Sequence, residues 1–433
     1  MLNIYDCLGK TFQCPDCGQN HTLPIKKVTS SDKGIESIVS FLQSIPIEGK
    51  SLLLLCDENT CQIAGNQLET ELKAEYKVEK LVLKTHGYSK VYAEEYYFPE
   101  IRTHSADKDF IVTVGTGSVT DMGKFVGNET GKPVIAFPTA PSMNAYTSGV
   151  AAYLANGIKM TTGVKPCTGV LIDTRINSQA PMILIQSGFA DSLAKAFANA
   201  DWKINAILTG EHYCTLPLKI TTASETHYKT HGDKIQARDE ATIASLMEGL
   251  TMGGFSMVLA GKSAPASGGE HLISHSLDMY AHRNNREVYS YHGLQVGLGV
   301  LFSALLFERL QNVSHPLRRT IDYDATITQL FGDESPKFKK AFANKKDNID
   351  TFLNHWDELK PVFSRPPSYK EILGYLQKTG CPTRFSEIDV DEALIGFVTQ
   401  SARYIRDRIT LLDIADELGV LEETFQATKS FLV

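Results

Sequence analysis

The sequence predicts a two-part protein in which an α/β domain is followed by an all-α domain. Three observations support this prediction. Short apolar runs alternate with helical stretches in the first part of the chain, nearly everything after Pro181 has helical periodicity, and 433 residues are too many for one ordinary compact core. Strands that alternate with helices indicate a parallel sheet with helices on both faces. We therefore expect domains at residues 1–184 and 185–433.

The strands of the first domain are expected where apolar runs end in polar or turn residues. The first run, SLLLLCDENT, begins at Ser51 and precedes a helix expected from Thr60 through Lys73. Further strands are predicted for VEKLVLK, DFIVTVG, KPVIAFP and GVLIDT, at residues 78–84, 109–115, 132–138 and 169–174. The runs GVAAYLANG and IKMTTGV, which lie between the last two strands, predict a hairpin.

The second domain is expected to consist of long helices. Apolar residues recur at three- and four-residue intervals in SLMEGLTMGGFSMVLA, LQVGLGVLFSALLF and EALIGFVTQSARYIRDRITLLDIADEL. The most apolar run, Val296 to Phe307, is shorter than the ~20 residues that cross a bilayer. It therefore predicts a buried core helix and no membrane span.

The composition favours small-molecule chemistry. Hydrophobic residues make up 42% of the chain and charged residues 21%, and a net charge of -7 gives no electrostatic reason to expect nucleic acid as a partner. The opening residues, MLNIYDCLGKTFQ, lack the basic and apolar segments of a signal peptide, so a cytoplasmic location is expected. In that setting, the eight cysteines are expected to be reduced thiols.

A short cysteine motif lies near the start of the chain. Cys14 and Cys17, in CPDCGQNH, have the spacing of a zinc knuckle, and Cys7 and His21 would complete a four-ligand structural site. Ordinary zinc ribbons take two pairs of ligands from separate turns, whereas Cys7 would have to fold back over a very short loop. Surface or packing cysteines are therefore the preferred interpretation, with zinc as the alternative.

The turn after the strand DFIVTVG is a candidate diphosphate site. In GTGSVTD, Gly115 and Gly117 allow a tight turn, Ser118 can cap the next helix, and the amides at the helix start would hold a diphosphate. The spacing differs from GxGxxG, because the third glycine would fall at Thr120, and an ordinary glycine turn is the alternative. Asp57 ends an earlier strand, where an aspartate can bind a ribose or cap a helix.

Three histidines and one aspartate in the helical part are candidate metal ligands. His271 and His275 are four residues apart in EHLISH and would share one helix face, a geometry that often serves a metal. His292 begins a long apolar helix, and Asp191 would complete an Asp/His/His set with an open position for substrate or water. The alternative is a chance pair of helix histidines, one of them buried and hydrogen-bonded.

Five segments resemble, in order and spacing, those of the iron-containing alcohol dehydrogenase and dehydroquinate synthase superfamily. They are GTGSVTD, FPTAPSMNAYTSG, SGFADSLAKAFANADW, APASGGEHLISH and HGLQVGLG. The chain is most similar to the sn-glycerol-1-phosphate dehydrogenase branch, and the resemblance extends from CDENTCQIAG to RYIRDRITLLDIADELG. It implies a dehydroquinate synthase-like fold, with a Rossmann-like dinucleotide-binding domain followed by a helical metal- and substrate-binding domain.

The resemblance also implies roles for individual residues. The ligands of one divalent ion, zinc, nickel or iron, would be Asp191, His271 and His292. The residues that contact NAD(H) or NADP(H) would be Asp57, Gly115, Gly117, Ser118, Asp121, Thr139 and Ser142. Of these, Asp57 would contact the adenosine ribose and favour NAD by repelling a 2'-phosphate, and Thr139 and Ser142 would lie on the nicotinamide side. Lys195 falls where the family has a lysine near the site, and His275 is expected beside the metal ligands or facing the substrate.

Two positions depart from the family's pattern. Where relatives read SRPASG, this chain has Ala264 before Pro265, so an arginine suited to a substrate phosphate is missing. Lys262 is the cation that would have to compensate. Asn144 stands where relatives carry an aspartate that contacts substrate hydroxyls. Both changes bear on the substrate, and neither affects the metal ligands.

The reaction that the resemblance implies is the reduction of a small ketone by NAD(P)H with a metal, most closely dihydroxyacetone phosphate to sn-glycerol 1-phosphate. A metal would stabilise the negative charge that builds on the ketone oxygen during hydride transfer. The alternatives are a dehydrogenase of another polyol or sugar phosphate, a dehydroquinate synthase-like cyclase, and a binding or regulatory protein that has lost turnover. A homo-oligomer is compatible with any of them.

Overall fold

The computed structural model describes residues 2–433, which divide into two compact units. Unit 1 contains the residues up to Ser192 and Lys219–Ser263, and unit 2 contains Leu193–Leu218 and Ala264–Val433. Sequence composition predicts a single boundary near residue 184, whereas here residues 219–263 return to unit 1. They do so because the long helix α11 (Glu240–Ala260) packs on elements of that unit.

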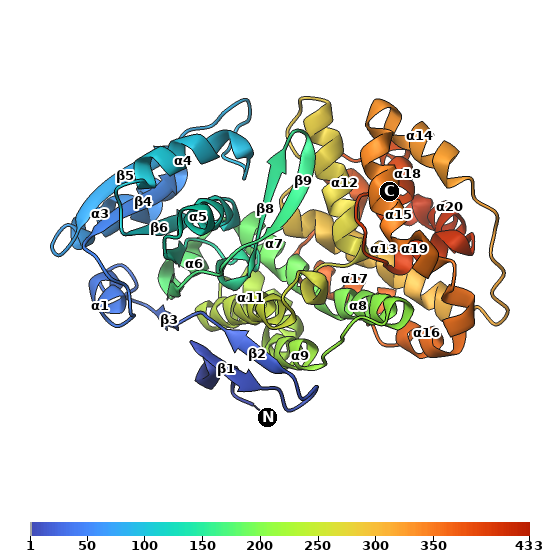
Figure 1. Ribbon diagram of the computed structural model, residues 1–433, viewed down its shortest axis with the longest axis horizontal. Coiled ribbons are helices and arrows are strands. Elements are labelled where there is room, and N and C mark those ends of the chain that lie inside the picture. Colours follow the sequence, from blue (N-terminus) through green and yellow to red (C-terminus); the bar gives the residue numbers. More distant parts are fainter. Residues whose placement is uncertain (1) are drawn as a thin grey trace. The chain divides into compact units, whose positions relative to one another are not determined.

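Unit 1 is built on a six-stranded parallel sheet, so the predicted α/β architecture is confirmed (Figure 1). The strand order is β3-β10-β7-β6-β4-β5. The strands are β3 (Lys27–Ser31), β4 (Ser51–Asp57), β5 (Lys77–Leu83), β6 (Phe110–Gly115), β7 (Val134–Pro138) and β10 (Gly169–Asp173). Strand β3 was not predicted, because its residues KVTSS contain no apolar run, yet it pairs with β10 along its whole length.

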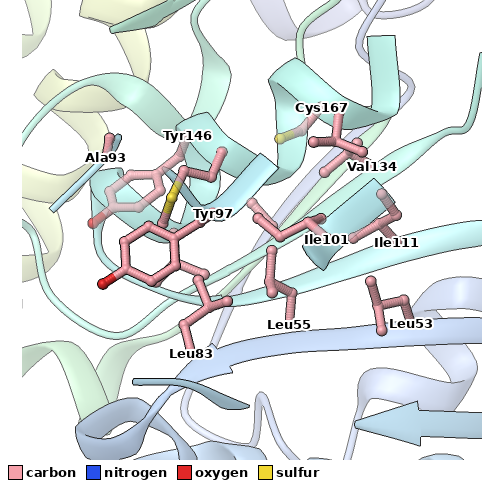
Figure 2. Packing of buried hydrophobic residues seen from close by; sticks show 14 of the residues in the cluster. Leu53, Leu55, Leu83, Ala93, Tyr97, Ile101, Ile111, Val134, Tyr146 and Cys167 are labelled. Carbon is pink, nitrogen blue, oxygen red and sulfur yellow. The ribbon is translucent and has the colours of Figure 1, made fainter. Parts of the chain in front are cut away.

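Alternate residues of β4 enter two different cores. Leu53 and Leu55 belong to one cluster, shown in Figure 2, to which α4 (Phe98–Ser105) and α5 (Gly117–Thr130) contribute. The neighbouring leucines of β4 belong to the second cluster, with α1 (Ile38–Gln43) and α3 (Asn66–Leu72). Each fully buried leucine stabilises the fold by about 1.5–3 kcal/mol, so the apolar strand requires helices on both faces.

The strand order reverses between β4 and β6. From β4 the chain passes to β5 on one side, and it then returns to form β6 on the other side of β4. Asp57 ends β4 and Gly115 ends β6, and the two strands are hydrogen-bonded neighbours. Ligands of open parallel sheets bind beyond the carboxyl ends of the strands at such a reversal.

Two antiparallel hairpins complete the strands of unit 1. The predicted hairpin is present as β8 (Val150–Ala155) and β9 (Ile158–Gly163). A second hairpin, β1 (Lys10–Gln13) and β2 (Asn20–Leu23), lies near the start of the chain, and β2 contacts α11.

The remaining helices of unit 1 connect these strands. The helix expected from Thr60 through Lys73 consists of α2 (Glu58–Thr60), a π-helical stretch at Cys61–Gly65, and α3. The others are α6 (Thr174–Gln179) and α10 (Gly232–Gln236). Helices α7 (Met182–Leu193) and α9 (Leu216–Thr230) run across the boundaries between the units.

Unit 2 is helical in the part of the chain that the structure describes, as predicted. Its long helices α12 (Gly269–Arg283) and α13 (His292–Gln311) pack against each other. The other helices are α8 (Lys195–Thr209), α14 (Tyr323–Phe331), α15 (Ser335–Ile349), α16 (Trp356–Phe363), α17 (Tyr369–Thr379), α18 (Glu392–Ser401), α19 (Leu411–Glu417) and α20 (Val420–Leu432).

Two helices, α11 and α13, are long and apolar enough to cross a membrane by length and composition alone. Most of their apolar windows, 72% and 83%, are buried inside the protein. Such burial is typical of core helices.

Candidate metal and cofactor sites

The turn after β6 leads directly into α5. The amide of Thr139 donates to the carbonyl oxygen of Gly115 at 3.1 Å, which holds the ends of β6 and β7 together. The N-cap of α5 is Thr116, and no side chain caps the first turn. The prediction that Ser118 caps this helix is wrong, because the helix already begins at Gly117. Amides without a side-chain cap at the start of a helix of this length suit an anion.

Both glycines of the turn are also closely packed against neighbouring side chains. A Cβ on Gly115 would lie 3.0 Å from Cγ2 of Val119, and one on Gly117 would lie 2.0 Å from the sulfur of Met143. The contact with Val119 is tight, whereas the end of the Met143 side chain is flexible and could move to make room. The glycines therefore permit a diphosphate to approach the backbone but do not by themselves indicate one.

Asp57 caps a helix in this structure. Its carboxylate accepts a hydrogen bond from the amide of Thr60 at 2.7 Å, and its own amide donates to the Thr60 hydroxyl at 3.0 Å. This reciprocal capping box is the alternative that the sequence left open. Contact between Asp57 and a ribose stays a prediction, although its place at the strand reversal suits one.

Asp121 is buried and bonded within unit 1. Its carboxylate pairs with Lys124 at 2.9 Å and accepts from the amide of Ala152 at 3.0 Å. Burial raises the pKa of the Asp121 carboxyl, and the charge of Lys124 opposes that rise. Lys124 in turn donates to the carbonyl oxygen of Ala145 at 2.8 Å and to the hydroxyl of Ser148 at 2.9 Å. Asp121 and Lys124 therefore fix the loop after β7, and a pyrophosphate contact of Asp121 stays a prediction.

The loop that follows β7 contains Thr139, Ser142 and Asn144, and it packs tightly against α7. Thr139 and Ser142 are buried, and the carbonyl oxygen of Ser142 accepts from the Ser187 hydroxyl at 3.3 Å. A Cβ on Gly188 would lie 1.8 Å from the carbonyl oxygen of a loop residue, so only glycine allows this approach. Asp191 lies one helical turn after Gly188 on α7. The side-chain amide nitrogen of Asn144 donates to Oδ2 of Asp191 at 3.2 Å. The loop thus positions Asp191.

The three histidines lie together in unit 2. The ring centroids of His271 and His292 are 5.2 Å apart, and those of His275 and His292 are 5.9 Å apart. Nδ1 of His271 is bonded to Glu270 at 2.8 Å, and Nδ1 of His292 is 3.4 Å from the hydroxyl of Ser274. The contacts at Nδ1 restrain each ring and make Nε2 its candidate ligand atom for a metal ion.

Asp191, His271 and His292 form a group with the chemistry to hold a metal ion. Each offers one ligand atom, and these atoms lie within 4.8 Å of one another. Two imidazoles and a carboxylate are ligands that zinc, iron and nickel accept. His275 is not in this group, which fits a place beside the ligands. Lys195 is buried and begins α8, after a turn that separates it from Asp191 on α7.

A buried carboxylate, which no sequence motif indicates, supports this part of unit 2. Asp201 accepts hydrogen bonds from the amides of Gly269 and Leu411, both at 2.7 Å. Burial, and then the charge of Glu270, raise the pKa of Asp201 well above its usual range. Its partners lie 68 and 210 residues away along the chain, and only the folded structure shows them.

The segment with Ala264 is buried and lies near an arginine. Ala264 is 2% exposed, and the side-chain amide of Asn199 donates to the carbonyl oxygen of Pro265 at 2.8 Å. Nη2 of Arg408 is 3.5 Å from the hydroxyl of Ser267 in the same segment. Nε of Arg408 has no hydrogen-bond partner among the described residues. Burial lowers the pKa of Arg408, and the nearby carboxylates oppose that change.

The chain resembles known dehydrogenases over nearly its whole length. A sequence model of the family described as iron-containing alcohol dehydrogenase matches residues 32–181. Glycerol-1-phosphate dehydrogenase of Bacillus velezensis is 30% identical over 371 residues, which cover 85% of this chain and 86% of that protein. The protein of the same name from Bacillus licheniformis is 28% identical and covers 97% of this chain and 96% of its own length.

Solved structures show the same fold. A probable glycerol dehydrogenase from Sinorhizobium meliloti superposes with a TM-score of 0.62 at 16% identity, covering 93% of this chain and 98% of its own. Glycerol dehydrogenase from Schizosaccharomyces pombe has a TM-score of 0.60 at 16% identity, with 94% and 91% covered. The dehydroquinate synthase-like fold expected from the sequence is thus confirmed as that of iron-containing alcohol dehydrogenases. The chain belongs to the glycerol-1-phosphate dehydrogenase branch of the iron-containing alcohol dehydrogenase family.

Proposed function

We propose that this protein is a metal-dependent NAD(P)H dehydrogenase that interconverts dihydroxyacetone phosphate and sn-glycerol 1-phosphate in the cytoplasm. The observation that carries the proposal is the group of Asp191, His271 and His292, whose ligand atoms lie close together in a chain of this family. Relatives that span more than nine-tenths of the chain are named for this activity.

Neighbouring side chains orient the candidate metal ligands through hydrogen bonds. A divalent ion held there would polarise a carbonyl oxygen, and a bound nicotinamide would supply the hydride. Glu270 and Ser274 hold the two ligand rings by Nδ1, so neither ring has to be reoriented when a substrate binds. Asn144 orients Asp191 through its side-chain amide. We assign Lys195 and His275 to the substrate side of this group.

We place the nucleotide at the strand reversal of unit 1. The carboxyl ends of β4 and β6, the start of α5 and the buried Thr139 and Ser142 all belong to that unit. Asp57 ends β4, where its charge favours NAD over NADP.

The substrate phosphate requires a cation, and Arg408 is our candidate. It lies against Ser267, in the segment where Ala264 replaces the family's arginine. An arginine fork suits a phosphate better than a lysine does. Ala264 and Asn144 are also the two observations that favour the second candidate, a dehydrogenase of another polyol.

A ketone panel tests the proposal. Metal-loaded protein is mixed with NADH and either dihydroxyacetone phosphate or dihydroxyacetone, and the nicotinamide absorbance is followed. We expect absorbance loss mainly with the phosphate ester and sn-glycerol 1-phosphate as the product. Product without net loss of NADH would indicate a cyclase instead, and no reaction with any ketone would indicate a binding protein.

The variant Ala264→Arg separates the two substrate classes. If position 264 has lost a phosphate contact, an arginine there raises kcat/KM for the phosphorylated ketone relative to the unphosphorylated one. Ala264→Gln is the matched control, because it adds similar length without charge. An unchanged ratio in Ala264→Arg would show that an arginine at position 264 adds no phosphate contact to the one we assign to Arg408.

A further inference from the structure

We propose that Cys14, Cys17, His21 and Cys214 bind a structural zinc ion, at a second metal site distinct from the histidine group of unit 2. Their ligand atoms lie within 4.8 Å of one another. Three thiols and one imidazole form a donor set that zinc prefers in closed structural sites. The proposal does not depend on the dehydrogenase activity.

The loop between β1 and β2 has the conformation of a metal knuckle. The amide of Gly18 donates to the carbonyl oxygen of Cys14 at 3.0 Å, and the amide of Cys14 donates to that of Gln19 at 2.8 Å. Gly18 has φ = +73°, a conformation that glycine adopts without strain. This turn directs both cysteines of the loop to one side.

The distance between Cys17 and His21 fits a shared ion. Sγ of Cys17 is 3.4 Å from Nε2 of His21. With Zn–S of about 2.3 Å and Zn–N of about 2.0–2.1 Å, two ligands at a tetrahedral angle are roughly 3.6 Å apart. His21 lies on β2 opposite Phe12 of β1, so the hairpin holds the imidazole in place.

The fourth ligand is Cys214 and not Cys7, which corrects the set considered from the sequence. Cys7 is buried in a 3-10 turn at Ile4–Cys7 and does not belong to the group. Cys214 lies two residues before α9, and Lys219 of α9 forms an ion pair with Asp16 of the knuckle at 2.6 Å. Because Asp16 lies between the two cysteines of the loop, this ion pair brings the start of α9 to the metal ligands.

The four side chains leave no position for a substrate. Cys14 is 2% exposed, His21 8% and Cys214 1%, and Cys17 is half-buried. None of the cysteines in the described residues forms a disulfide in this structure. A zinc ion here would join the N-terminal hairpin, which packs on α11, to the segment that begins α9. Its role is therefore to stabilise the fold.

Cobalt substitution of the full-length protein tests the site. Cobalt bound to thiolates absorbs strongly in the near ultraviolet through sulfur-to-metal charge transfer, and the Asp/His/His group contains no thiolate. We expect this band in the wild type and in Cys7→Ser, the matched control. We expect its loss in Cys17→Ser and in Cys214→Ser, each with one bound zinc fewer per chain by elemental analysis.

A measurement on the unaltered protein covers the case in which a serine variant fails to fold. Titrating the wild type with a mercurial should release zinc in step with thiol modification, while metal bound only by Asp and His ligands would not follow it. No zinc released by the mercurial, a disulfide between Cys14 and Cys17 in anaerobically purified protein, or an unchanged cobalt band in Cys214→Ser would each overturn the proposal.

Discussion

The contact between Asn144 and Asp191 determines what an aspartate at position 144 would do. Asn144→Asp would place a second carboxylate about where an amide now donates at 3.2 Å. Two like charges at that distance repel, and one pKa rises or the loop moves. We expect metal-free Asn144→Asp to have a lower Tm than the wild type, and metal to raise its Tm by more than it raises that of the wild type.

Asn144→Ala is the control for this substitution, because it removes the hydrogen bond without adding charge. Its metal-free Tm should lie between those of the wild type and Asn144→Asp. Equal metal-induced shifts in all three proteins would show that position 144 has no electrostatic influence on Asp191.

The sequence indicates which residues could form a site more reliably than it indicates which residues those will contact. Cys14 and Cys17 form a recognisable motif because they stand within four residues, whereas spacing does not associate them with Cys214, some 200 residues further along. Asp57 shows the opposite case. Its position at a strand end was predicted correctly, yet the same position permits a helix cap, and the structure contains that cap.

At the scale of elements, the close packing of α12 and α13 depends on one glycine. A Cβ on Gly299 would lie 2.5 Å from the carbonyl oxygen of Glu270, which is backbone and cannot rotate away. Gly299→Ala therefore forces the two helices apart, and with them His271 and His292. We expect weaker metal binding, by at least tenfold in Kd, in a protein whose helical circular dichroism is retained.

The control for Gly299→Ala is Gly374→Ala. Gly374 lies within α17, and its Cβ would meet no atom within 4 Å. Alanine in an open helical position stabilises by about 0.4–1 kcal/mol, so this variant should bind metal like the wild type. Metal affinity that is unchanged in Gly299→Ala would show that helix spacing does not limit the site.

Strands can be predicted from the sequence where their burial requires a hydrophobic pattern. The apolar runs of β4, β6, β7 and β10 are evident in the sequence because burial on both faces of a sheet requires such runs. Strand β3 and the β1–β2 hairpin were missed, because edge strands and small hairpins satisfy their backbone with few apolar residues. The N-cap of α5 is Thr116, two residues before the predicted Ser118, an error typical of helix ends.

At the scale of the whole molecule, a buried ion network joins distant segments of unit 2. Arg403 is fully buried, with Nε 3.1 Å from Asp413 and Nη2 2.8 Å from Glu417. Lys345 also binds Asp413, at 2.8 Å. Arg403→Met leaves the carboxylates without their central cation, and we expect the free energy of unfolding to fall by about 3–5 kcal/mol in urea titrations.

The exposed pair of Lys429 and Glu392 provides the comparison. Lys429→Met breaks an ion pair of 2.7 Å at the surface, where such pairs contribute about 0–1 kcal/mol. Similar losses in Lys429→Met and Arg403→Met would show that burial of the network adds no stability.

The sequence predicts that an α/β part precedes a helical part, but it does not predict which residues belong to each compact unit. Composition changes near residue 184, but residues 219–263 are helical and still belong to unit 1. Apolar periodicity shows that a helix such as α11 has a buried face. It does not show which unit covers that face, because the partners are far away in the sequence.

His271 is a metal ligand in the proposed site, and His275 is not. Metal bound per chain can be counted in the wild type, His271→Ala and His275→Ala after identical loading, with circular dichroism to confirm folding. We predict that His271→Ala binds one ion fewer than the wild type and that His275→Ala binds the same number. A folded His271→Ala protein with the wild-type metal content would show that His271 is not a metal ligand.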